Sequence, residues 1–167
     1  MAAFKESLSK IKAFVFDVDG VFTDGGLYLF PDGEMVRKVN IKDGFAVKFA
    51  IEMGFKVAII SGGDSLAVKN RFLKLGVSDV YLPSENKWRD FQKFSSAYQL
   101  KTDEILYMGD DIPDFEIMKR LPITACPFDA SIDIKRISAY ISTFRGGEGC
   151  VRDIIEQVLR THEKWLI

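Results

Sequence analysis

The chain has 167 residues, of which 47% are hydrophobic and 28% are charged, and its formal net charge is −1. This length and balance predict one domain, residues 1–167, that buries a sizeable core, and they exclude a disordered chain. The small net charge gives no general attraction to nucleic acid. No apolar run approaches the roughly 18 residues that cross a bilayer, so neither nucleic acid nor a membrane is an expected partner.

The two cysteines, Cys126 and Cys150, lie far apart and form no redox or metal-binding motif. No signal sequence precedes them, which indicates a reducing compartment. We therefore expect a cytoplasmic protein.

The predicted elements alternate between strands and helices along the chain. A short helix or frayed lead-in at 1–10 precedes a buried strand at 11–16, and two strand-like runs within about 26–39 flank a Pro-Asp-Gly turn, which indicates a β-hairpin. Asp43 is the expected N-cap of the next helix. Further strands are expected at 55–60, 79–82, 104–108 and 139–142, and helices at 45–53, 65–75, 87–98, 113–119 and about 150–159, the last within a C-terminal segment of about 145–167. This alternation predicts an α/β fold, a Rossmann-like, doubly wound and mostly parallel sheet.

A pair of acids, Asp17 and Asp19, directly follows the first predicted strand. Ionised carboxylates are costly to bury unless a cation, a base or water receives them. Two other predicted strands also end in polar loops, at Ser61 and at Asp110. Because ligands bind at the carboxyl ends of strands in an open parallel sheet, we expect these groups to converge at one edge.

The collected side chains are oxygen ligands together with one lysine, Lys87. Oxygen-only sets suit magnesium, which takes one or two carboxylates and substrate phosphate. A metal-oriented carboxylate can act as a nucleophile, and an acid two residues further on can act as general acid and then as general base. The set therefore predicts phosphoryl transfer with Mg²⁺ as cofactor.

Four motifs in this order resemble the haloacid dehalogenase superfamily. They are Asp17-Val18-Asp19-Gly20, Ile59-Ile60-Ser61-Gly62, Lys87, and Gly109-Asp110-Asp111-Ile112-Pro113-Asp114. The resemblance implies that Asp17 is the nucleophile and Asp19 the general acid and base. It also implies that Ser61, Gly62 and Lys87 bind phosphate, that Asp17, Asp19 (through its backbone carbonyl) and Asp110 bind magnesium, and that Asp111 and Asp114 support them from outside the direct ligand set.

Plainer interpretations stay open for several of these residues. Asp19-Gly20 also fits a simple turn, Ser61 a helix cap, and Lys87 one of several lysines near a helix start. The hairpin fits a flap beside the site or an ordinary edge hairpin. His162 is expected in solvent, outside any catalytic site.

Two further stretches resemble the capless sugar-acid phosphatases of that superfamily. Residues 17–25 match the pattern DxDGVxTDG, and residues 145–152 contain the pattern GGxGxxR. The second stretch also fits an ordinary loop before a helix. No segment is long enough for a cap domain. The resemblance implies a homotetramer with hairpins in the subunit contacts, and it implies that Arg145 or Arg152 helps to close a site.

The same resemblance implies a sugar-acid phosphate as substrate, an eight-carbon 3-deoxy-ulosonate phosphate, with a nine-carbon relative as the alternative. Many eight-carbon enzymes carry Arg after the serine motif and nine-carbon ones carry Glu, whereas this chain has Gly62-Gly63. Arg71 is a candidate contact for carboxylate or phosphate because arginine binds them in a bidentate way, although an exposed helix arginine fits equally. A non-catalytic scaffold is disfavoured, because both Asp17 and Asp19 are present.

Overall fold

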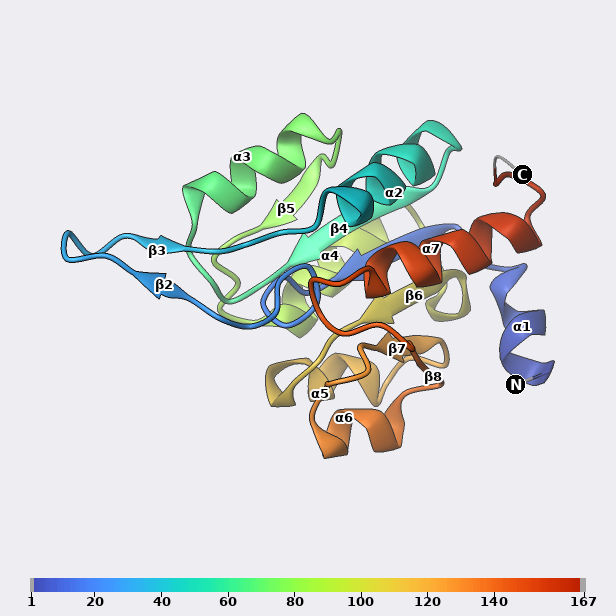
Figure 1. Ribbon diagram of the computed structural model, residues 1–167. Coiled ribbons are helices and arrows are strands. Elements are labelled where there is room, and N and C mark those ends of the chain that lie inside the picture. The colour runs from blue at the N-terminus through green and yellow to red at the C-terminus, as the bar shows by residue number, and fades with distance from the viewer. Residues whose placement is uncertain (1, 166–167) are drawn as a thin grey trace.

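A computed structural model describes residues 2–165 of the chain. Its main sheet consists of β1 (Ala13–Phe16), β4 (Lys56–Ile60), β5 (Asp79–Tyr81), β6 (Ile105–Met108), β7 (Thr124–Cys126) and β8 (Tyr140–Ile141). Among the described residues these six strands are all parallel, in the order β5-β4-β1-β6-β7-β8 (Figure 1). The predicted Rossmann-like α/β architecture is confirmed.

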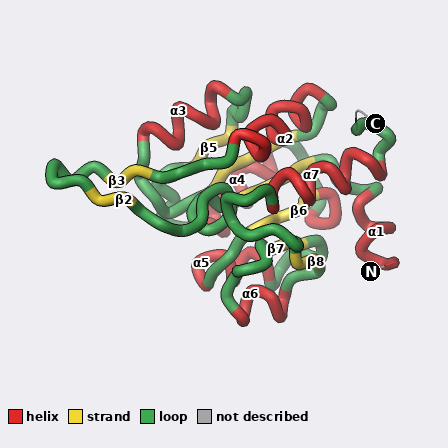
Figure 2. The backbone as a smooth tube through the Cα atoms, in the orientation of Figure 1, coloured by secondary structure: helices red, strands yellow, loops and turns green. Residues whose placement is uncertain are grey.

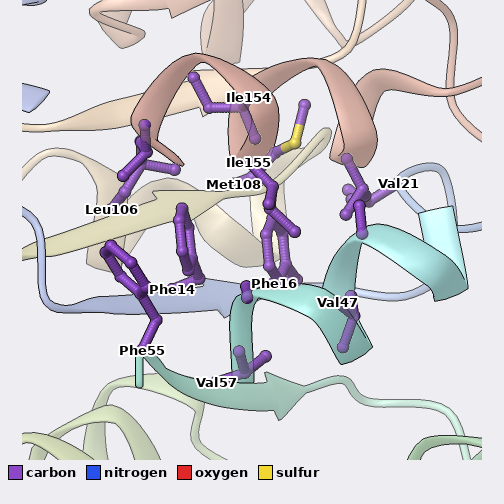
Figure 3. Close-up of a cluster of buried hydrophobic side chains, with 14 of the residues drawn as sticks. Phe14, Phe16, Val21, Val47, Phe55, Val57, Leu106, Met108, Ile154 and Ile155 are labelled. Carbon is purple, nitrogen blue, oxygen red and sulfur yellow. The ribbon is translucent and has the colours of Figure 1, made fainter. Parts of the chain in front are cut away.

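Helices cover both faces of this sheet. They are α1 (Ala2–Leu8), α2 (Ile41–Glu52), α3 (Leu66–Lys74), α4 (Lys87–Ala97), α5 (Ile112–Met118), α6 (Ile132–Ile137) and α7 (Cys150–Thr161), with a 3₁₀ turn at Thr102–Glu104. Because side chains alternate along a strand, Phe14 and Phe16 join the core under α2 and α7 (Figure 3), to which α3 also contributes. Ala13 and Val15 join the core under α4, α5 and α6. β1 is buried on both faces, as its continuous apolar run predicts.

The register of the three central strands sets their polar ends level with one another. Phe16 is paired with Ile59 on one side and with Met108 on the other. The ladder continues by one bond beyond β1, where the N–H of Asp17 donates to the carbonyl of Met108 at 3.0 Å. The loops that follow β1, β4 and β6 therefore leave the sheet side by side.

A hairpin of β2 (Tyr28–Leu29) and β3 (Met35–Val36) extends away from the sheet (Figure 1). Figure 2 shows that most of the hairpin is loop. Its strands, β2 and β3, are shorter than the strand-like runs predicted from the sequence. The side chains of Tyr28 and Leu29 are 63% and 73% exposed. The hairpin thus presents large apolar side chains to solvent.

The start of α2 differs from the prediction. Asn40 is the N-cap, with its Oδ1 accepting the N–H of Lys42 at 2.9 Å, so the expectation that Asp43 caps this helix was wrong. Asp43 is instead fully buried in the first turn and accepts the backbone N–H of Arg152 at 2.8 Å. The contact with α7 decides the position of this acid.

His162 was expected in solvent, but its side chain is half-buried. Its Nε2 lies 3.0 Å from the carbonyl oxygen of Leu8, and its ring packs edge-on against Phe55. His162 therefore joins the end of α7 to α1 and to the residue that precedes β4.

Within residues 2–165, no helix combines the length and the apolar character that a membrane-spanning segment needs.

Candidate active site

A cavity of about 570 Å³ opens at the carboxyl ends of the central strands. Its walls come from the loops after β1, β4, β5 and β6 and from the first turns of α4 and α5. The predicted site residues that line it are Asp17, Asp19, Ser61, Gly62, Lys87, Asp110 and Asp111. The convergence expected from the polar strand ends is thus present in the structure.

Lys87 joins the acids at the floor of this cavity. Its Nζ lies 2.9 Å from Oδ2 of Asp17 and 2.7 Å from Oδ1 of Asp114. All three side chains are at least 90% buried, because 9%, 9% and 0% of their surfaces remain exposed. Burial lowers the pKa of Lys87, but the two carboxylates outweigh it and the pKa is raised, which keeps the ammonium charged.

Asp17 keeps one carboxylate oxygen free. Within the described residues its buried Oδ1 has no hydrogen-bond partner, whereas Oδ2 faces Lys87. Burial, and then the charge of Asp114, raises the pKa of Asp17 to about 6 against the opposing effect of Lys87. An unpartnered buried acceptor is costly, so this oxygen is suited to receive a cation or to attack an electrophile.

Asp17, Asp110 and Asp114 can each offer one oxygen, with the three oxygens within 4.8 Å of one another. Burial, followed by the charges of Asp17 and Asp114, raises the pKa of Asp110 to about 7. The positive charge of Lys87 is therefore smaller than the negative charge that these three carboxylates can carry. Oxygen donors with excess negative charge fit a hard divalent cation such as Mg²⁺.

Asp114 is more central than the sequence motif suggests. It is fully buried, it accepts the hydroxyl of Tyr107 at 2.6 Å through Oδ1, and it accepts the N–H of Asp110 at 3.1 Å through Oδ2. Asp111, in contrast, is exposed at the N-cap of α5. The sequence motifs did not predict a role for Tyr107, although the hydroxyl of a tyrosine in a buried strand needs a hydrogen-bond partner.

Ser61 lies at the cavity wall and does not cap α3. The N-cap of that helix is Ser65, whose hydroxyl accepts the N–H of Val68 at 3.4 Å. The backbone of Ser61 is fixed by Tyr81, whose carbonyl accepts its N–H at 3.2 Å, and by the N–H of Ser84 at 2.9 Å. Its hydroxyl takes no protein partner within residues 2–165 and is available to a ligand.

Asp19 lies at the rim, where it forms a bidentate ion pair with Arg37. Nε and Nη2 of Arg37 donate to Oδ1 and Oδ2 of Asp19 at 2.7 and 3.0 Å. The hydrogen bond to Asp19 raises the pKa of Arg37. Arg37 follows β3, so this contact brings the hairpin to the site. The sequence motifs did not predict this ion pair, because no sequence pattern connects two residues that lie 18 positions apart.

The glycine-rich stretch at 145–149 packs against the loop that follows β1. The N–H of Gly147 donates to the carbonyl of Val21 at 2.9 Å, and a Cβ at Gly146 would overlap the carbonyl of Gly20. Gly20 itself has a φ of +80° and lies so close to Asp110 that a Cβ would overlap its carboxylate. This stretch therefore supports the loop that carries Asp19 from within the same chain.

The three arginines of the sequence prediction lie outside the site cavity. Arg71 is half-buried beside Gly44 and lines a second cavity, between the hairpin and α3. Arg145 is 57% exposed and lies 3.8 Å from Asp129, and Arg152 lies over the ring of Trp165. Within one chain, the described residues bring none of the three to Asp17.

No protein-family model matches the chain. A curated relative from Escherichia coli K12, 3-deoxy-D-manno-octulosonate 8-phosphate phosphatase KdsC, is 29% identical over 154 residues, which is 92% of this chain and 82% of the relative. A crystal structure of a probable YrbI family phosphatase from Pseudomonas syringae is 32% identical, with a TM-score of 0.94 over 98% of this chain and 93% of that one. The chain belongs to the YrbI family of phosphatases.

A third relative of this YrbI-family chain is a 3-deoxy-D-manno-octulosonate 8-phosphate phosphatase from Moraxella catarrhalis. Its crystal structure contains a magnesium ion, a phosphate ion and a KDO molecule. It is 26% identical, with a TM-score of 0.92 over 96% of this chain and 92% of that one. The resemblance to the haloacid dehalogenase superfamily is confirmed together with the YrbI family.

Proposed function

We propose that this chain is a magnesium-dependent phosphatase that hydrolyses 3-deoxy-D-manno-octulosonate 8-phosphate (KDO 8-phosphate) to the free sugar acid and phosphate, a step in lipopolysaccharide precursor synthesis. The observation that carries the proposal is the unpartnered Oδ1 of Asp17 at the floor of the cavity, beside Lys87. The similarity to enzymes named for this substrate supports the choice of ester.

The reaction is built on two carboxylates. Oδ1 of Asp17 attacks phosphorus, the ester P–O bond breaks, and its electron pair stays on the leaving oxygen, which takes a proton from Asp19. Water then attacks the phosphorus of the aspartyl phosphate, Asp19 takes the proton from that water, and the P–O bond to Asp17 breaks to release phosphate. Lys87 and the hydroxyl of Ser61 bind and orient the phosphoryl oxygens.

Magnesium would be held by Asp17 and Asp110, by the backbone carbonyl of Asp19, and with support from Asp114 and Asp111. When bound, it supplies positive charge that offsets the charge of the phosphoryl group. The excess of buried carboxylates over Lys87 supports this assignment.

The test is phosphate release by the purified chain with Mg²⁺. We expect KDO 8-phosphate to exceed a nine-carbon ulosonate 9-phosphate and generic sugar phosphates in kcat/KM. Asp17→Asn should abolish turnover, and Asp19→Asn should lower it by about 10² to 10⁴, the usual range for acid–base catalysis. Asp103→Asn, an exposed acid paired with Lys10 near the amino end of β6, is the matched control. Full activity of either active-site variant would exclude this mechanism.

We further propose that the protein is a cytoplasmic homotetramer whose hairpins meet at the subunit contacts. The support is the exposed apolar surface of the hairpin, which includes Tyr28, Leu29 and Phe30. In such an assembly, Arg71, Arg145 or Arg152 of one subunit would contact the sugar acid in the site of a neighbour. Mass measurement by light scattering, with and without the hairpin side chains, tests the assembly.

A further inference from the structure

The orientation of Asp19 depends on one residue at the base of the hairpin. Within the described residues, the Asp19 carboxylate takes no side-chain partner other than Arg37. The two parallel N–H···O bonds fix both the place and the plane of the carboxylate. Only 7% of the Arg37 side chain is exposed, against 36% for Asp19, so a covered arginine holds an acid that remains open to the cavity.

The loop after β4 leaves room for this ion pair. A Cβ at Gly63 would lie 3.1 Å from Nη2 of Arg37 and 3.3 Å from Oδ2 of Asp19, which is tighter than ordinary contact. Glycine at this position therefore lets the guanidinium and the carboxylate approach the cavity wall together. Gly63 offers a second way to disturb the pair without removing either charge.

We infer that Arg37 is a positioning residue: it holds the side chain of Asp19 at the cavity rim, so that the carboxyl group faces the leaving oxygen once one of its oxygens has taken up a proton from solvent while the other stays bound to Arg37. The inference rests on the proposed function, in which Asp19 is the general acid. Asp19 lies in a loop without helix or strand. Without the bidentate bonds its carboxylate can turn about its side-chain torsions, and small errors in the placement of a catalytic group reduce the rate strongly.

The leaving group separates this role from a general loss of structure. An alkyl alcohol such as that of KDO 8-phosphate is a poor leaving group and requires the proton, whereas p-nitrophenolate departs without it. The quantity to compare is kcat/KM, which covers the steps up to the departure of the leaving group. The variants are Arg37→Met, Arg37→Lys and Gly63→Ala. Lys38→Met is the matched control, because Lys38 is the next residue and forms an exposed ion pair with Asp24 at 3.2 Å.

We expect Arg37→Met to lower kcat/KM for the alkyl ester by at least about tenfold, a part of the range of acid–base catalysis, and to leave that for p-nitrophenyl phosphate within about twofold. Arg37→Lys should recover part of the loss, since a lysine restores the charge without the bidentate geometry. Gly63→Ala should show the same preference to a smaller extent, and Lys38→Met should change neither ester.

Three outcomes for Arg37→Met would overturn the inference, and the first is an unchanged kcat/KM for both esters. Equal losses on both esters would assign Arg37 a structural role alone. A higher rate for Arg37→Met would mean that the pair restrains Asp19, contrary to the inference. Failure of the proposed function is recognised separately: Asp19→Asn would then leave the alkyl ester unaffected, and Arg37 would have no general acid to position.

Discussion

Replacing Lys87 with methionine should destabilise the protein strongly when no divalent cation is present. The change removes the cation that lies 2.9 Å from Asp17 and 2.7 Å from Asp114, and both carboxylates are buried. Removing one partner of a buried ion pair typically costs about 3–5 kcal/mol, because the remaining charge stays buried without compensation. Since domains of this kind have total stabilities of about 5–15 kcal/mol, the variant should still fold.

The measurement is urea denaturation in EDTA, followed by circular dichroism. Lys119→Met is the matched control, because Lys119 pairs with Glu116 at the surface, where 42% and 56% of the side chains are exposed. Such pairs contribute at most about 1 kcal/mol. Added Mg²⁺ should then stabilise Lys87→Met more than the wild type, because the cation meets a site with one more uncompensated negative charge.

Two results would contradict this reasoning. If the Lys87 variant in EDTA stayed within about 1 kcal/mol of the Lys119 variant, the buried carboxylates would be less dependent on Lys87 than the geometry indicates. If Mg²⁺ stabilised the wild type and the Lys87 variant equally, the cation would bind elsewhere.

Other parts of the molecule lead to three further predictions. Burial raises the pKa of Asp43 from 3.8 to about 6. Between about pH 6 and pH 4 the folded state therefore binds a proton that the unfolded state does not. The free energy of unfolding rises by about 2–3 kcal/mol from this group as the pH falls through that range. Asp43→Asn should lack that gain in denaturation curves at the two ends of this range; an unchanged pH dependence would contradict it. Leu29→Ser, in a side chain that is 73% exposed, should change the stability of the monomer by no more than about 0.5 kcal/mol and should lower the mass in light scattering; an intact tetramer would argue against hairpin contacts. Gly146→Ala should cost about 1–3 kcal/mol and lower kcat, since its Cβ would overlap the carbonyl of Gly20, and wild-type values for both would refute that close approach.

The predictable part of the site is the part built by the sheet. Strand ends are visible in the sequence as apolar runs followed by polar residues, and parallel topology places Asp17, Ser61 and Asp110 at one edge. The sequence did not predict those roles that depend on which of two similar residues makes a tertiary contact. Asn40 and Asp43 are both good helix caps, and only burial against α7 shows that Asp43 is used differently. Arg37 escaped prediction because the path of the hairpin, which no local pattern encodes, brings it to Asp19.

Gly146 and Gly147, near the carboxyl end of the chain, pack on the loop that follows β1 near its amino end. This loop is therefore complete only after both segments have been synthesised. During synthesis, the nucleophile and its strand emerge early, but the support for the neighbouring loop emerges more than a hundred residues later. A nascent or shortened chain that ends before Arg145 would hold Asp17 and Lys87 without a completed loop around Gly20. Catalytic competence is therefore expected as one of the last properties that the growing chain acquires.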